Sequence, residues 1–515
     1  MPVSELFARA RAERPGHLAL VDATGPLTYA ELGEGTDRAA GWLRGQGVGA
    51  GDRVVYAGGG DRTFLALLWA AFRIGAVFVP VHPDLTDDQI DHIVRDCTAT
   101  LAVCPPTAGA AARTTVEMER AAREMARTPA DHTTAEVADD AVALLIYTSG
   151  TTGRPKGVVC PNRQILAAAR AVQAGLGYRA DDVVLCRLPL SFDYGLYQVL
   201  LCTLTGSSLV LADRDGDVGL IRVIERHGVT VIPLVPSLAQ ILGLLQRKLR
   251  RATRVRLFTN TGARPSPAVM RELLDAFPGS VFASMYGMTE CKRISILDPA
   301  LYERHPDSVG RAIPGARIRV IGPDGRTLPA GEAGEIVVEG ETVMAGYWGV
   351  PLERQSRYVR RADGSLELHT GDQGRLDADG LLYFVGRDDD MIKRRGVRMS
   401  LSEIELAAER VPGVYAAVAP RPADESAPLL LAVRTDLAPH EVRTALARHL
   451  DPARLPDRIV PIDTVPLTAN GKPDRAAVAL LLLAGAAAAP SAAVSTAVTP
   501  VPAALTGSSR GPVAV

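Results

Sequence analysis

The residues with the clearest chemical potential in this 515-residue chain form the stretch Thr148-Ser149-Gly150-Thr151-Thr152-Gly153-Arg154-Pro155-Lys156-Gly157. It directly follows the apolar run 141–147, which predicts a buried strand. Glycine lets main-chain N–H groups approach an anion closely, while Ser, Thr and Lys add hydroxyl donors and a mobile positive charge. The pattern predicts a phosphate-binding loop, although a surface turn rich in Ser, Thr and Gly has the same composition.

The nucleotide P-loop, GxxxxGK[ST], is excluded by the spacing. Counted from Gly150, the glycine required before the lysine is replaced by Pro155. Gly157 stands where a Ser or Thr would hold magnesium. A different kind of phosphate loop is therefore indicated.

The whole chain must provide the elements that position this loop. Its length suggests two or three domains of roughly 100–200 residues each. With 57 basic and 58 acidic residues, its net charge of −1 gives no support for a nucleic-acid partner. The six cysteines show no CxxC spacing, so neither a disulfide framework nor a zinc site is predicted, and a reduced cytoplasmic setting is expected.

No membrane association is predicted. The N-terminus lacks the basic-then-apolar layout of a signal peptide. The longest apolar stretch, 476–489, falls short of the roughly 20 residues that a membrane span needs. We expect it to form a terminal helix.

The first part of the chain alternates predicted strands and helices. Strands are expected at 53–56, 76–80 and 100–103, with helices at 64–74 and 87–96 between them. The same rhythm returns with strands at 229–233 and 255–258. Such βαβ order predicts an α/β fold with doubly wound, mostly parallel sheets.

The pattern of apolar and charged residues changes at two points further along the chain. From residue 316, short alternating runs separated by glycine-containing turns predict a small antiparallel β unit. After residue 387, dense charge followed by a helical pattern at 402–411 predicts a domain boundary. We therefore expect a large domain at 1–387, a small α+β domain on a hinge at 388–483, and a disordered Ala/Pro/Ser/Thr-rich tail at 484–515.

Five separated motifs resemble those of the adenylate-forming superfamily, which includes acyl-CoA synthetases, adenylation domains and luciferases. The loop 147–157 is similar to the signature loop of that family. The segments that resemble the remaining motifs, in order, are 284–290 (SMYGMTE), 369–372 (HTGD), 386–393 (GRDDDMIK) and 468–472 (TANGK). The resemblance covers residues 5 to about 480 and implies formation of an acyl-AMP from ATP and a carboxylic acid, with Mg²⁺ and release of pyrophosphate.

The resemblance implies a role for each matched residue. The residues expected to hold the β and γ phosphates are Thr148, Ser149, Gly150, Thr151, Thr152, Gly153 and Lys156. Thr289 would donate to the α-phosphate and Glu290 would hold Mg²⁺, a hard cation that prefers oxygen ligands. Tyr286 would stack on adenine, while Asp372 and Arg387 would bind the ribose. Lys472, from the small domain, would reach the substrate carboxylate and the α-phosphate, and Asp389 would be the hinge.

The substrate acid is predicted from residues beside the matched motifs. The pocket is expected to include Asp193, Tyr194, Thr261, Lys292 and Arg293. A carboxylate in an apolar pocket favours a substrate that carries a cation, so Asp193 indicates an amino acid; the alternative is that Asp193 binds a local backbone turn. Lys292 and Arg293 suggest a second carboxylate or a hydroxyl on the substrate, as in stand-alone amino-acid ligases of bacterial secondary metabolism and antibiotic biosynthesis, although a surface location for Lys292 is equally compatible.

The acceptor of the activated acyl group stays open at this stage. A free-standing carrier protein with a phosphopantetheine thiol is favoured because of Asp193, and coenzyme A is the alternative. A diazotase-type reaction that joins nitrite to an aryl amine would also suit Asp193. A nucleotide-binding regulator without catalysis is disfavoured because every matched catalytic position is filled. The oligomeric state is not predicted.

Overall fold

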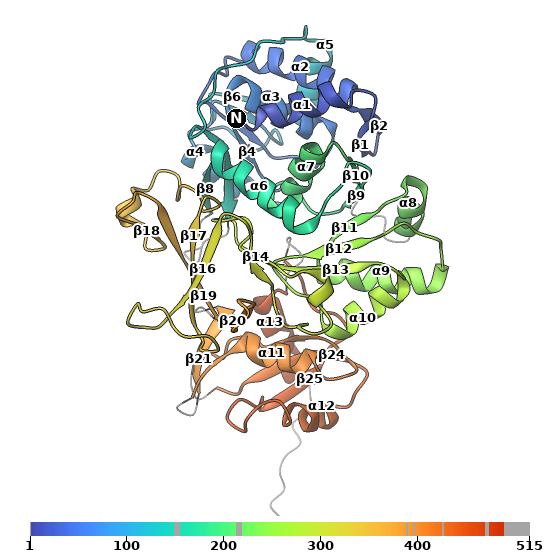
Figure 1. Cartoon of the computed structure of the whole chain (residues 1–515), viewed down its shortest axis with the longest axis vertical. Helices are drawn as coiled ribbons and strands as arrows, with labels where there is room; N and C mark the ends of the chain where they lie inside the picture. Colours follow the sequence, from blue (N-terminus) through green and yellow to red (C-terminus); the bar gives the residue numbers. More distant parts are fainter. Residues whose placement is uncertain are drawn as a thin grey trace, which may run out of the picture.

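A computed structural model describes residues 2–148, 155–212, 219–387, 390–394, 397–424, 427–468 and 473–488. Figure 1 shows two α/β layers at the top and right, a β unit at the left and a small domain below them. Among the described residues, none of the helices combines the length and the apolar character that crossing a membrane requires.

The first α/β layer contains a six-stranded sheet in the order β6-β5-β3-β4-β7-β8. Its strands are β3 (Arg53–Tyr56), β4 (Val77–Pro80), β5 (Leu101–Val103), β6 (Thr114–Val116), β7 (Val142–Thr148) and β8 (Lys156–Pro161). All neighbours are parallel except β7 and β8.

Helices cover both faces of this sheet, as predicted for a doubly wound fold. Val54 faces the core formed with α2 (Tyr29–Gly45), α3 (Arg62–Ile74) and α5 (Met118–Arg127). Its neighbour Val55 faces the opposite core, under α4 (Asp87–Asp96). This alternation follows from the two-residue period of a strand.

The second α/β layer contains a nine-stranded sheet in the order β15-β14-β13-β12-β11-β9-β10-β1-β2. Its strands are β1 (Leu18–Asp22), β2 (Gly25–Thr28), β9 (Val183–Cys186), β10 (Ser208–Leu211), β11 (Val231–Leu234), β12 (Leu257–Asn260), β13 (Val281–Tyr286), β14 (Ser295–Ile296) and β15 (Arg311–Ala312). The helices of this region are α1 (Ser4–Glu13), α6 (Asn162–Leu176), α7 (Asp193–Thr205), α8 (Leu220–His227), α9 (Pro236–Leu249) and α10 (Pro267–Ala276), with a 3-10 turn at Pro299–Leu301. The central strands are parallel, so their carboxyl ends meet at one edge.

The predicted antiparallel β unit follows. Its strands are β16 (Ala316–Ile321), β17 (Gly334–Gly340), β18 (Tyr358–Arg360), β19 (Leu366–Leu376) and β20 (Leu382–Arg387), with a 3-10 turn at Leu352–Arg354. Gly325 has a positive φ of 76° in the turn after β16, which explains why glycine occupies that position.

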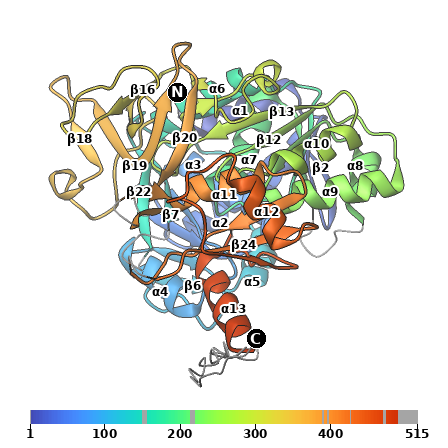
Figure 2. The same cartoon turned by 90° about the horizontal axis from the view of Figure 1, so that it is seen from below.

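The small domain has a hydrophobic core of its own. Its elements are β21 (Met391–Arg394), β22 (Val397–Ser400), α11 (Leu401–Glu409), β23 (Val414–Val418), β24 (Leu430–Thr435), α12 (Pro439–Leu446), β25 (Arg458–Pro461) and α13 (Arg475–Ala488). Figure 2 shows it in orange and red, seen from below against the large domain. The boundary between the large and the small domain at residues 387/388 stays our proposal. Helix α13 continues to Ala488, past the predicted start of the tail at 484, and the rest of the predicted tail lies outside the described residues.

Candidate active site

The predicted phosphate loop lies between two antiparallel strands. Thr148 ends β7 and pairs with Lys156, the first residue of β8. Of the predicted loop residues, Ser149, Gly150, Thr151, Thr152 and Gly153 lie outside the described chain. A Cβ at Gly157 would come within 2.9 Å of the Tyr147 ring, so glycine is required for the close packing at the base of the loop.

A distant segment of the chain adds to the outer edge of β8. The main chain of residues 345–348 is hydrogen-bonded to β8 on both sides of Val158: Ala345 N–H donates to Val159 and Trp348 N–H to Gly157. This places the ring of Tyr347 beside Lys156, whose Nζ lies 5.7 Å from the ring centroid. The phosphate loop is thus positioned by a segment nearly 200 residues further along the sequence.

Tyr347 also holds the predicted metal ligand. Its hydroxyl donates to Oε1 of Glu290 over 2.6 Å, and Glu290 is buried. Burial and the charge of Glu290 raise the pKa of Tyr347, so this phenol stays a hydrogen-bond donor. Thr289 is half-buried directly before Glu290. Sequence reasoning missed Tyr347, because nothing local marks a residue 57 positions from its partner.

Tyr347→Phe is expected to weaken binding of the magnesium–nucleotide complex. A hydrogen bond to a charged group contributes about 1.5–3 kcal/mol, so KM for MgATP should rise about tenfold or more. Tyr358→Phe is the matched control, since the Tyr358 ring packs 5.7 Å from the Tyr347 ring and its hydroxyl has no hydrogen-bond partner in the described chain. Equal KM values in the two variants would contradict this role.

The predicted nucleotide residues come together from two different sheets. Tyr286 ends β13, and its hydroxyl donates to Oδ2 of Asp372 in β19 over 2.6 Å. Arg387 is the register partner of Asp372, and its Nε lies 3.3 Å from Oδ1. Asp372 is buried, whereas the Arg387 side chain is half exposed. The buried carboxylate therefore has a donor at each of its oxygens, and its role in binding ribose stays a prediction.

These three residues line a cavity of about 760 Å³ between the large and small domains. From the small domain, Asp390 and Arg475 also line it, and Arg475 forms ion pairs with Asp390 and Glu405. Asp389 and Lys472 lie outside the described residues, next to Asp390 and Pro473 respectively. Their roles stay predictions.

Three of the predicted acid-binding residues, Asp193, Tyr194 and Arg293, are in contact with one another. Asp193 begins α7, and its Oδ2 lies 3.1 Å from Nη1 of Arg293. Their side chains are only 16% and 4% exposed. The guanidinium also lies over the ring of Tyr194, 4.9 Å from its centroid. Asp193 thus has an ion-pair partner 100 residues away.

Lys292 is fully buried, so the surface alternative for it was wrong. Its backbone has a left-handed φ of 62°, and its carbonyl oxygen would lie 2.2 Å from a Cβ at Gly287. Glycine at 287 lets the chain turn back here and direct Lys292 inward. Nζ has no hydrogen-bond partner in the described chain. Burial raises the pKa of the nearby Cys160 thiol, and the Lys292 charge opposes that shift.

Two hydroxyls share this unpartnered state. Thr261 was predicted in the pocket, and its Oγ1 is buried without a hydrogen-bond partner among the described residues; the same holds for Oγ of Ser191. Ser191 lies in the stretch 188–195, beside which the substrate pocket was expected, but no role was predicted for it. Ser191, Thr261 and Lys292 thus each carry a buried polar atom of the kind that a ligand or an ordered water would satisfy.

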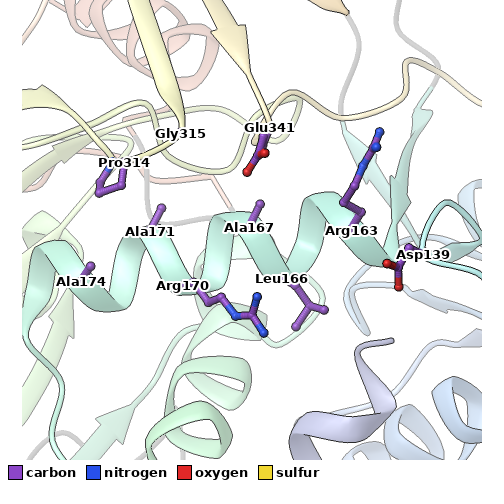
Figure 3. Close-up of a pocket in the computed structure, with 10 residues that line it drawn as sticks. All are labelled: Asp139, Arg163, Leu166, Ala167, Arg170, Ala171, Ala174, Pro314, Gly315 and Glu341. Carbon is purple, nitrogen blue, oxygen red and sulfur yellow. The ribbon is translucent and has the colours of Figure 1, made fainter. Parts of the chain in front are cut away.

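A second hollow, of about 450 Å³, lies along α6 and away from these residues (Figure 3). Alanines 167, 171 and 174 of α6 face the loop that carries Pro314 and Gly315, and charged side chains such as Arg163 and Glu341 stand at its rim. It contains none of the residues predicted to bind nucleotide or acid.

Comparisons with known proteins identify the family. The family model of AMP-binding enzymes matches residues 7–348. The chain belongs to the AMP-binding enzyme family. It is therefore an enzyme of the kind that activates acids with ATP by adenylation. Solved structures of VinN are 40% identical and cover 75% of this chain and 98–99% of theirs, with TM-scores of 0.68 and 0.69, and one contains L-aspartate.

Two further proteins are similar to this chain over most of its length. ATP-bound MatB from Rhodopseudomonas palustris is 27% identical, covers 93% of this chain and 98% of its own, and has a TM-score of 0.81. Phenyloxazoline synthase MbtB from Mycobacterium sp. (strain MCS) is 32% identical over 92% of this chain. The chain spans only 41% of that protein's length and 19% of the next curated relative.

The residues present suit Mg²⁺ bound largely through a substrate. No cluster of three or more His, Cys, Asp or Glu side chains that could hold a metal occurs among the described residues. Glu290 offers one buried carboxylate, with one oxygen already hydrogen-bonded. Mg²⁺ is commonly bound by one or two carboxylates together with substrate phosphates and water, which a single carboxylate here would satisfy.

Proposed function

We propose that this enzyme activates an amino dicarboxylic acid, such as aspartate or a close analogue, as its acyl adenylate. The observation that carries this proposal is the buried Asp193–Arg293 ion pair beside the fully buried Lys292, whose Nζ has no hydrogen-bond partner among the described residues. These three side chains together carry one negative and two positive charges. Because an unpaired buried charge is costly, a substrate carboxylate beside Lys292 would compensate the excess cation.

The ion pair also restricts which acids can bind. An ammonium group bound at Asp193 would share its carboxylate with Arg293, so a second anion would help to compensate Arg293. A substrate that carries both an ammonium group and a second carboxylate satisfies both partners at once. A fatty or aryl acid would have to enter without exchanging either charge, which favours amino dicarboxylic acids over those classes.

A relative supports this substrate class. VinN was solved in complex with L-aspartate, and it shares 40% identity with this chain. Aspartate carries the three groups that the pocket would use: an ammonium for Asp193, one carboxylate for Arg293 and Lys292, and a second carboxylate to react.

The proposed reaction has two steps. A carboxylate oxygen attacks the α-phosphorus of ATP, and pyrophosphate leaves with the bonding electrons. Thr289 and Lys472 would donate to the oxygens where negative charge develops, Glu290 would hold Mg²⁺, and Lys156 with the loop from Thr148 would bind the departing phosphates. Bound Mg²⁺ supplies charge neutralisation on the phosphate oxygens.

In the second step a thiolate attacks the acyl carbon and AMP leaves. We propose the phosphopantetheine of a carrier protein as the thiol, with coenzyme A as the alternative. Rotation of the small domain about Asp389 would exchange Lys472 for the segment around Gly396 at the active site.

Pyrophosphate exchange over a panel of acids tests the substrate proposal. Aspartate and other amino dicarboxylic acids should stimulate exchange at least tenfold more than their monoamides, because an amide cannot neutralise the two buried cations. Succinate, which lacks the ammonium, should fail to the same degree. Stimulation only by fatty, aryl or neutral amino acids would overturn the proposal.

A further inference from the structure

A cluster of cations follows the end of α9, at the edge of the large domain. Residues 247–254 contain Arg247, Lys248, Arg250, Arg251 and Arg254 and no acidic residue, in a chain whose net charge is −1. All five are exposed. Two large apolar side chains, Leu244 and Leu249, are exposed beside them by 59% and 38%. We call residues 244–254 the basic turn.

Internal contacts compensate only part of this charge. Arg247 pairs with Glu272 of α10 over 3.0 Å, and Arg251 lies 3.9 Å from Glu225 of α8. Within the described chain, the side chains of Lys248, Arg250 and Arg254 form no ion pair. Cations in the last helical turn also complement the helix dipole, which accounts for Arg247 and Lys248 but not for the later residues.

Arg250 has a backbone conformation that is unfavourable for arginine, which suggests that its charge has a function. Arg250 is the C-cap of α9 and has a left-handed conformation, with φ 48° and ψ 45°. Gly177, Gly206 and Gly228 hold the same conformation at the C-caps of α6, α7 and α8. Glycine adopts this conformation without strain, whereas arginine does not. An arginine here retains exposed charge at the expense of local stability.

The basic turn lies one helix length from the edge of the sheet where β11 and β12 end and Thr261 follows. α9 begins directly after β11, where the Leu234 carbonyl accepts from Asn260, the residue before Thr261. The 14 residues of α9 span about 21 Å at 1.5 Å per residue. This is the scale of an extended phosphopantetheine arm. α10, which pairs with Arg247, also packs against β23 of the small domain.

We infer that the basic turn is a docking surface for an acidic carrier protein, which is the acceptor of the proposed function on which this inference rests. Opposite charges steer such a partner onto the surface, and Leu244 with Leu249 supply an apolar contact. Arg250 is held in place because its N–H donates to Gln246, whose side-chain amide donates to the Arg251 carbonyl.

The test compares two thiol acceptors: a phosphopantetheinylated carrier protein with an acidic surface, and free pantetheine. Lys248→Glu and Arg254→Glu are each expected to lower kcat/KM for the carrier protein about tenfold at low salt. Pantetheine loading and pyrophosphate exchange should stay unchanged. Arg317→Glu, which reverses an exposed cation on β16, is the matched control and should change none of these rates.

Arg250→Gly separates docking from folding. It should raise or preserve the melting temperature, because glycine relieves the left-handed strain, and still reduce carrier-protein loading several-fold. Unchanged carrier loading in all three variants would overturn the inference, as would equal losses with pantetheine. A failure of the proposed function would be seen in a different measurement, because the unmodified enzyme would then show no amino-acid-dependent pyrophosphate exchange.

Discussion

Lys472→Ala should reduce acid-dependent pyrophosphate exchange by a factor of at least about 10²–10³, the range typical of losing one donor to a developing oxyanion. No other lysine of the predicted site belongs to the small domain, so no nearby ammonium can replace it there. The measurement is exchange at saturating ATP with the best acid of the panel.

A control variant and a second assay show whether the loss in Lys472→Ala is specific to adenylate formation. Lys248→Ala removes an exposed lysine remote from the nucleotide cavity and should leave exchange unchanged. Thioester formation from a supplied acyl adenylate should fall much less than exchange in Lys472→Ala, since the lysine acts in the first step only. Exchange within a few-fold of the parent rate would remove Lys472 from the catalytic residues.

Asp193→Ala is expected to have the second large effect. It leaves Arg293 buried without its ion-pair partner, and breaking a buried pair in this way costs about 3–5 kcal/mol. It also removes the proposed partner of the substrate ammonium. Amino-acid-dependent exchange should fall at least about 10²-fold, and the midpoint of urea unfolding should fall with it.

The double variant Asp193→Ala/Arg293→Met separates the two effects. Replacing both charges by apolar groups should recover most of the lost stability, because no buried charge is left unpaired. Exchange with amino dicarboxylic acids should stay low. If the double variant regained both stability and exchange, the ion pair would be structural and the substrate proposal would fail.

Local pattern was sufficient to predict much of the fold. The helix predicted at 87–96 is α4, and the strands predicted at 53–56 and 255–258 correspond to β3 and β12. These elements have strong apolar periodicity and clear ends. Thr86, for example, caps α4 by accepting from the N–H of Gln89. The β unit was equally visible, because its alternating runs are separated by turns that need glycine.

Contacts between distant segments could not be predicted in this way. The partner of Asp193 is 100 residues away and that of Glu290 is 57 residues away. Residue types also do not predict burial reliably. The Cys-Lys-Arg sequence at 291–293 would suit an exposed turn, yet Lys292 and Arg293 are buried. Their orientation depends on the turn packed against Gly287, which only the fold reveals.

The edge pairing of residues 345–348 with β8 bears on how this protein can be divided or rebuilt. The phosphate loop resembles a self-contained strand–loop–strand unit, yet its outer neighbour comes from the connection between β17 and β18. A transplanted β7–β8 hairpin would arrive without the phenol that meets both Lys156 and Glu290. Chimeras between related enzymes should therefore exchange these two segments together. A crossover placed between them would combine the β7–β8 hairpin of one enzyme with the 345–348 segment of another.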